Sequence, residues 1–212
     1  MKDGNQVIDT PVKSTLFGKF YEGIVLGWLK ENEHFVPSDG KPRIYWEDVD
    51  PVNGNTQLNK LLEDYKAEKQ FCTPDGLLEK EDKFYIWEAK NWPLWKEGKK
   101  DYDQLRDVLL SLPQLLATEA DYRKEKKAVH GFLFSWWSEP IGANALLEEI
   151  RTLIAPRTFE IYYTNLILED CIERQYPWYV QIVTKEKLGV EKFFKDLLGR
   201  RMGKRVKRLN NE

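Results

Sequence analysis

The segment that most constrains the fold is residues 84–90, FYIWEAK, an aromatic and apolar run that ends in charged residues. Successive side chains of a β-strand point to opposite faces, so a strand here places alternate residues together. One face would hold Phe84, Ile86, Glu88 and Lys90, and the other Tyr85, Trp87 and Ala89. Charges are rarely placed in such a strand without partners, so Glu88 and Lys90 indicate a polar site.

A second strand is predicted at residues 71–76, FCTPDG, and the polar run 79–83 reads as the hairpin loop between the two strands. If the strands pair, Asp75 lies beside Glu88. Two carboxylates and the Lys90 ammonium would then converge at the end of an apolar strand. Hard divalent cations prefer such oxygen ligands, and a lysine can handle water or a phosphate. The alternative is an edge strand whose outer face is salt-bridged.

The pair Pro74-Asp75 followed by Glu88-Ala-Lys90 resembles the signature of the PD-(D/E)XK nuclease superfamily, which has the restriction-endonuclease-like fold. The arrangement is similar to that of the archaeal Holliday-junction resolvases, and the whole chain looks like a nuclease-like protein of spindle-shaped archaeal viruses. The resemblance implies a Mg²⁺ or Mn²⁺ ion held by Asp75 and Glu88, with the carbonyl of Ala89 as a third oxygen ligand. Lys90 would orient or help deprotonate the attacking water and offset charge on the scissile phosphate.

The resemblance extends to one polar residue on each side of the motif. Glu22 matches an acidic residue that the superfamily often carries on the helix before its sheet. It lies on the flank of an apolar stripe, from where it could lean into the site or face water. Gln104 matches a polar residue on the following helix. The implied catalytic set is therefore Glu22, Asp75, Glu88, Lys90 and Gln104.

The order of patterns predicts an α/β fold, a mixed central sheet flanked by helices. The predicted elements are a helix from residue 14, a loop at 31–42, a strand at 43–49, a helix at 58–69, the hairpin at 71–91, a helix at 98–121 kinked or split at Pro113, a strand at 128–137, a helix at 142–154, strands at 158–168 and 179–184, and a helix at 190–198. We expect a single nuclease domain over residues 1–212. A restriction-endonuclease-like αβββαβ core would occupy residues 14–137, a C-terminal elaboration residues 138–198, and a basic tail residues 199–212.

Charge is unevenly distributed along the chain. The net charge is −2, yet residues 200–208 hold six basic side chains and the first 199 residues carry a net charge of −7. For a DNA-binding protein, either the tail supplies the attraction or the DNA face is locally basic. The remaining alternative is that the tail is only a solvated end.

Several classes of protein are disfavoured by what the 212-residue sequence lacks. No apolar run approaches the ~18 residues of a membrane span, and the N-terminus does not resemble a signal peptide, so we expect an intracellular protein, in the host cell if viral. No phosphate-binding glycine loop is present, so no nucleotide cofactor is expected. Two cysteines are too few for a cluster of four thiolates. Cys72 reads as a buried thiol, and a disulfide between Cys72 and Cys171 is the alternative.

These observations predict a metal-dependent DNA endonuclease. The resemblance to junction resolvases implies branched DNA as substrate, a homodimer, and a role in replication, repair or recombination. A DNA-binding module on the same fold with little cleavage activity is one alternative. A processing nuclease that acts on RNA or on DNA ends is another.

Overall fold

The computed structural model describes residues 11–52, 55–90 and 101–185, and the surroundings of side chains from residue 19 onward. The chain divides into two compact units, Met1–Glu169 and Asp170–Glu212, with the boundary inside a helix. No helix of the described residues is long and apolar enough to cross a membrane.

The described elements are, in chain order, α1 (Pro11–Asn32), β1 (Val36–Pro37), β2 (Ile44–Tyr45), the 3-10 helix η1 (Trp46–Asp48), α2 (Thr56–Glu68), β3 (Phe71–Cys72), β4 (Gly76–Lys80), β5 (Lys83–Lys90), α3 (Asp101–Leu109), the 3-10 helix η2 (Pro113–Leu116), β6 (Glu119–Tyr122), β7 (Glu125–Trp136), α4 (Ala143–Ile154), β8 (Thr158–Tyr163) and α5 (Thr164–Arg174). The first unit is thus a mixed α/β structure, as predicted.

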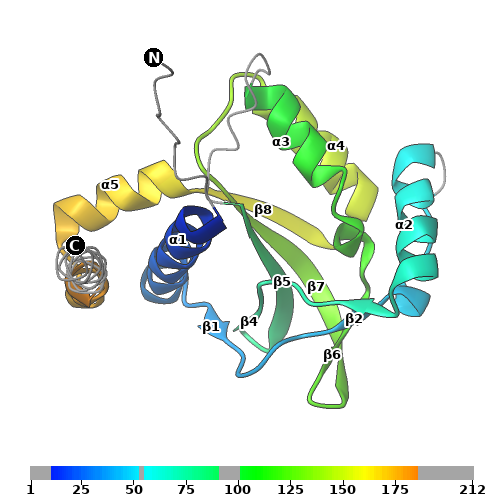
Figure 1. Cartoon of the computed structure of the whole chain (residues 1–212), viewed down its shortest axis with the longest axis horizontal. Helices are drawn as coiled ribbons and strands as arrows, with labels where there is room; N and C mark the ends of the chain where they lie inside the picture. The colour runs from blue at the N-terminus through cyan, green and yellow to red at the C-terminus, as the bar shows by residue number, and fades with distance from the viewer. Residues whose placement is uncertain (1–10, 53–54, 91–100, 186–212) are drawn as a thin grey trace, which may run out of the picture. The chain divides into compact units, whose positions relative to one another are not determined.

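A curled mixed sheet of six strands forms the centre of the first unit among the described residues (Figure 1). Its order is β1–β4–β5–β7–β6, and β8 also pairs with β7. The pairs β1–β4, β4–β5 and β6–β7 are antiparallel, whereas β5–β7 and β7–β8 are parallel. The region predicted as a C-terminal elaboration therefore contributes β8 to the same sheet.

The β4–β5 hairpin differs from its prediction by a few residues. The strand that pairs with β5 is Gly76–Lys80, not residues 71–76, because Leu77 and Leu78 bury their side chains on the two faces of the sheet. The loop is the two-residue turn Glu81–Asp82, whose positive φ angles match the twist of the strands it joins. Asp75 therefore lies immediately before β4.

Helices cover both faces of the sheet (Figure 1). On one face, α1 buries Ile24, Val25 and Leu29, and its Trp28 ring contacts Tyr162 of β8. On the other face, α2, α3, η2 and α4 pack with Ile86 and with alternate residues of β7 in one apolar cluster. The predicted alternation of β5 is confirmed, because Ile86 belongs to this cluster while Tyr85 contacts Phe35 after α1.

Four predicted segments differ from the structure in part. The loop at 31–42 contains β1, and the strand at 43–49 is only β2 before the chain turns into η1 around the buried Trp46. The helix at 98–121 is split before Pro113, which cannot donate to a helix: α3 stops at Leu109 and η2 begins at Pro113. Residues 119–122, predicted as the end of that helix, form β6. The strand at 158–168 ends at Tyr163, where α5 begins with Ile167 and Cys171 at helical spacing.

The second unit begins with the end of α5, and its described part is helical. Residues 177–185 form a helix, so the predicted strand at 179–184 is wrong. The rings of Tyr176 and Trp178 stack at 5.5 Å between centroids where the two helices meet. The predicted helix at 190–198 and the basic tail lie outside the described residues.

Candidate active site

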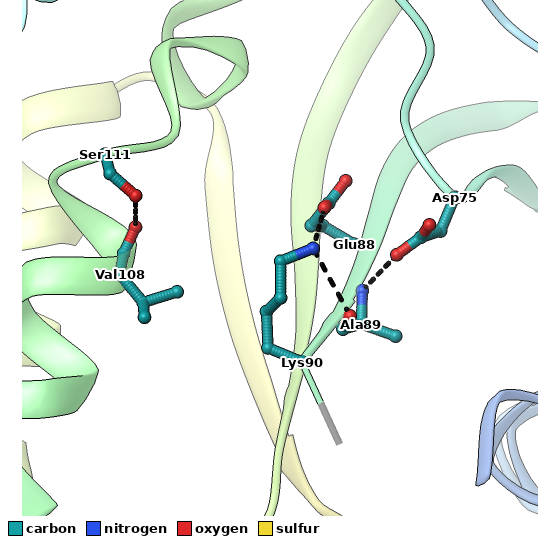
Figure 2. Close-up of polar contacts among 6 residues, drawn as sticks. All are labelled: Asp75, Glu88, Ala89, Lys90, Val108 and Ser111. Atoms are coloured by element: carbon teal, nitrogen blue, oxygen red, sulfur yellow. Dashed lines mark hydrogen bonds and ion pairs between the residues drawn. The ribbon is translucent and has the colours of Figure 1, made fainter. Parts of the chain in front are cut away.

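Asp75 and β5 are joined by a direct hydrogen bond. The backbone N–H of Ala89 donates to Oδ2 of Asp75 at 2.8 Å, which holds the carboxylate against the strand that carries Glu88 (Figure 2). The bond forms because Gly76 pairs with Trp87, so the residue before β4 lies opposite the end of β5. Asp75 is exposed, which leaves its carboxylate open to a ligand. The predicted proximity of Asp75 and Glu88 is present in the structure.

Glu88 is a buried carboxylate paired with Lys90. Its side chain is 9% exposed, and the Lys90 ammonium donates to its Oε1. The same ammonium donates to the Ala89 carbonyl at 3.4 Å, so one cation bridges two neighbouring oxygens (Figure 2). The pKa of Glu88 is raised, first by burial and then by the Asp75 carboxylate, while Lys90 opposes both effects. A carboxylate in this setting favours a close positive partner.

Glu22 comes to the same site from α1. Its carboxyl is half-buried, and its pKa is raised first by that burial and then by the negative charge of Asp75. Lys90 lowers the pKa of Glu22 and Glu88 raises it further, so all three motif residues act on this carboxyl. The structure thus brings Glu22 within electrostatic reach of the site, whereas the sequence left open whether it faced water.

Gln104 lies on α3, where it is half-buried. This helix belongs to the layer that covers the Ile86 face of β5, the face that Glu88 and Lys90 share. Just after α3, the Ser111 hydroxyl donates to the Val108 carbonyl in the last turn of the helix at 2.7 Å (Figure 2). A catalytic role for Gln104 stays a prediction from the resemblance.

The alternative of a salt-bridged edge strand is wrong in one respect. The Glu88–Lys90 ion pair is present, but β5 lies between β4 and β7 and is an interior strand of the sheet. An interior strand has no need of exposed charge to discourage pairing with another chain. The ion pair therefore calls for another explanation than protection of an edge.

The oxygen atoms gathered near the end of β5 are of the type that a hard cation binds. Asp75 and Glu88 offer carboxylate oxygens, and the Ala89 carbonyl already accepts from an ammonium. Mg²⁺ and Mn²⁺ take such ligands, and Mg²⁺ commonly uses one or two protein carboxylates together with water and substrate oxygens. Within the described residues, no group of three or more His, Cys, Asp or Glu side chains that could hold a metal is found. The fit therefore depends on two carboxylates and a carbonyl.

Three supporting residues were missed by reasoning from the sequence. The indole N–H of Trp87 donates to Oγ of Ser135 at 3.1 Å, and Ser135 is fully buried in β7. A Cβ placed on Gly76 would lie 3.2 Å from the Trp87 ring, so the indole packs closely on the backbone next to Asp75. The signal for Ser135 was a lone hydroxyl inside an apolar aromatic run, which indicates a buried partner.

Both cysteines are free thiols, so the alternative of a disulfide between them is wrong. Cys72 of β3 pairs with Ile44 of β2 and is half-buried rather than fully buried. Its pKa is raised to about 12 by burial and by the charge of Glu88. A protonated thiol is a poor ligand for a hard cation, so Cys72 adds no ligand to the set.

No protein-family model matches the chain, and comparisons with curated proteins and with solved structures also find no match.

Proposed function

We propose that the chain is a metal-dependent nuclease with a restriction-endonuclease-like core. The observation that carries this proposal is the convergence of Asp75, Glu88 and Lys90 where β4 begins and β5 ends. Support also comes from topology, because α1, β1, β4, β5, α3 and β7 occur in the order αβββαβ once the intervening β2, η1, α2, β3, η2 and β6 are set aside. β7, the second strand after α3, pairs parallel with β5, the strand that carries the Glu-x-Lys residues.

Each side chain has a distinct part in the proposed chemistry. Asp75, fixed by the Ala89 N–H, and Glu88 would hold the cation together with the Ala89 carbonyl. A bound Mg²⁺ or Mn²⁺ would supply Lewis-acid stabilisation of the charge that develops on the phosphate. The Lys90 ammonium would move away from Glu88. It would then orient the attacking water and offset the charge of the phosphate. Glu22, with its raised pKa, is suited to accept a proton from that water.

The first test removes the charge of Asp75 while keeping its shape. We expect wild-type protein to cleave DNA with Mg²⁺ or Mn²⁺ and not with EDTA. Asp75→Asn can still accept from Ala89, so it should fold normally yet lose metal binding in calorimetry and lose cleavage. Asp82→Asn is the matched control, because Asp82 is exposed in the turn of the same hairpin. Equal metal binding by both variants would refute the site.

The second test addresses Lys90. Lys90→Ala should cleave about 10²–10⁴-fold more slowly while binding DNA nearly as well, because general acid–base groups act mainly on the rate. Lys83→Ala, at the exposed start of the same strand, should cleave at the wild-type rate. A wild-type rate for Lys90→Ala would leave the ion pair with a structural role only.

The same assays separate the other functions. DNA binding without metal-dependent cleavage would favour a binding module on this fold. A panel of four-way junction, linear duplex, free-ended DNA and RNA identifies the substrate. Sedimentation of the protein with a junction tests the homodimer that the resemblance implies.

A further inference from the structure

A single ammonium contacts two of the oxygens that the proposed cation would use. The Lys90 ammonium donates to Oε1 of Glu88 and, at 3.4 Å, to the carbonyl of Ala89 (Figure 2). A metal ion bound to the same two oxygens would lie beside this ammonium, and positive charges a few ångströms apart repel one another. In this arrangement Lys90 takes the place of the cation that Glu88 and Ala89 would share.

Lys90 and Glu88 differ in their freedom to move. Both lie on the same face of β5, two residues apart, and the Lys90 side chain folds back along the strand to reach Glu88 (Figure 2). The Glu88 side chain is 9% exposed, and the backbone of Asp75 also lies against its carboxylate, whereas the Lys90 side chain is 35% exposed. The lysine can therefore turn into solvent, while the carboxylate stays in place for another cation.

The Glu88–Lys90 pair is more enclosed than a surface pair such as Lys80–Glu33. Both side chains of the surface pair are open to water, at 31% and 36%, so water can stabilise either charge when the two separate. Glu88 lacks that access, and a buried carboxylate that loses its positive partner is costly. Lys90 can therefore leave Glu88 at low cost only when another cation takes its place.

We propose that Lys90 is a built-in competitor for the metal: its ammonium holds Glu88 and the Ala89 carbonyl, and a divalent cation binds there by displacing it. The inference rests on the proposed function, because it concerns the ion that the nuclease would use, and it adds how that ion enters the site. Displacement leaves the ammonium charged and free to contact a phosphate. Metal entry and the release of Lys90 toward the substrate are then one event.

Removing the ammonium while keeping a long side chain tests the competition. In calorimetry of the full chain with Mn²⁺ and no nucleic acid, we expect Lys90→Met to bind the ion about tenfold or more tightly than wild type, because a hydrogen bond to a charged group is worth at least that factor. Mn²⁺ should also raise the midpoint of thermal unfolding more in Lys90→Met than in wild type, since tighter binding stabilises the folded state more.

Two further variants separate direct contact from charge. Lys19→Met removes an exposed cation of α1 that lies within electrostatic reach of Glu22, so it changes the charge near the site and leaves the Glu88–Lys90 pair intact. Its affinity for Mn²⁺ should stay within about twofold of wild type, because exposed charges are screened. Lys90→Arg keeps the net charge and a positive partner for Glu88, so it serves even if Lys90→Met does not fold. A guanidinium binds a carboxylate through two parallel hydrogen bonds, so Lys90→Arg should bind Mn²⁺ more weakly than wild type.

Crystals soaked in Mn²⁺ provide a direct view, because anomalous scattering locates the ion. We expect the ion on Glu88 and the Ala89 carbonyl, with the Lys90 ammonium turned away from both. An ion bound to Glu88 while the ammonium keeps both of its contacts would overturn the proposal. Equal Mn²⁺ affinities of wild type and the two Lys90 variants would overturn it as well, as would a gain in Lys19→Met as large as that in Lys90→Met.

These outcomes are distinct from those that test catalysis. If wild type cleaves DNA but the Lys90 variants bind Mn²⁺ as wild type does, the nuclease stands and the competition does not. If the affinities follow the expected order but no nucleic acid is cleaved, the competition stands and the nuclease does not. If neither wild type nor the variants bind Mn²⁺, both proposals are refuted.

Discussion

At the scale of single residues, the site depends on what surrounds a buried carboxylate. Glu88 is enclosed in the sheet, where the Lys90 ammonium and the backbone of Asp75 both lie against its carboxylate. The sequence identified both residues because charge at the end of an aromatic strand requires a partner. It could not show that the ammonium also reaches the Ala89 carbonyl, since that depends on how the side chain folds back along its own strand.

The thiol of Cys72 offers a chemical reporter for Glu88. Its pKa of about 12 should make alkylation of the native protein by iodoacetamide in EDTA far slower than that of the unfolded chain. Any stability linked to this raised pKa is present below the unfolded value of 9.0 and is lost as pH rises toward 12. Glu88→Gln removes the second cause of the shift, so Cys72 should react faster in that variant.

Mass spectrometry of each cysteine measures these rates, and Cys171 serves as the internal control. Its pKa is raised by burial and by Asp170, not by Glu88. A rate at Cys72 that does not change in Glu88→Gln would contradict the proximity of the two side chains.

At the scale of elements, sequence periodicity predicted the long, regular parts. The alternation in β5 and the apolar stripe of α1 follow directly from burial on one side, and both were found. The short strands β1, β2 and β3 were poorly predicted, because two residues carry no periodicity and their pairing depends on distant partners. The position of Asp75 was predicted correctly although its own strand was not, since the predicted loop at 79–83 is centred on the observed turn Glu81–Asp82 and the chain folds back at nearly the same point.

Close packing of Trp87 on Gly76 should make the hairpin sensitive to one methyl group. Gly76→Ala places a Cβ 3.2 Å from an indole that is tied to Ser135, so we expect a loss of about 1–3 kcal/mol in the free energy of unfolding. In a Trp87→Leu background the same change should cost less, with a coupling of about 0.5 kcal/mol or more. Urea denaturation of the four proteins measures the coupling, and strictly additive costs would show that the indole is not the cause.

At the scale of the whole molecule, charge is divided between the described residues and the segment beyond them. The six basic residues at 200–208 were identified from composition, and they lie outside the described residues. The second unit has no counterpart in the sequence analysis, because its helices were read there as a strand and an elaboration. Composition can assign charge to a segment, but it cannot determine which folded unit carries it.

Truncation after Gly199 tests the contribution of the tail. The truncated chain should bind all DNA sequences more weakly, and the slope of log affinity against log salt should fall by about 0.9 for each phosphate of duplex DNA that the tail neutralises. Metal binding at Asp75 and Glu88 should be unchanged in calorimetry. A full-length variant with the six basic residues replaced by glutamine separates charge from length. Coincident salt slopes for full-length and truncated protein would make the tail a solvated end.

The connectivity around β5 has a consequence for how the protein reaches its native state. The β4–β5 hairpin closes through two residues, whereas pairing Phe84 with Val129 requires a much longer loop to close. Short hairpins form in about 1–10 μs, and distant parallel pairing is slower. We therefore expect Asp75 and Glu88 to meet early, as a solvated acidic pair, before the rest of the sheet encloses them. Divalent ions would then accelerate folding of the chain, which refolding kinetics with and without Mg²⁺ would measure.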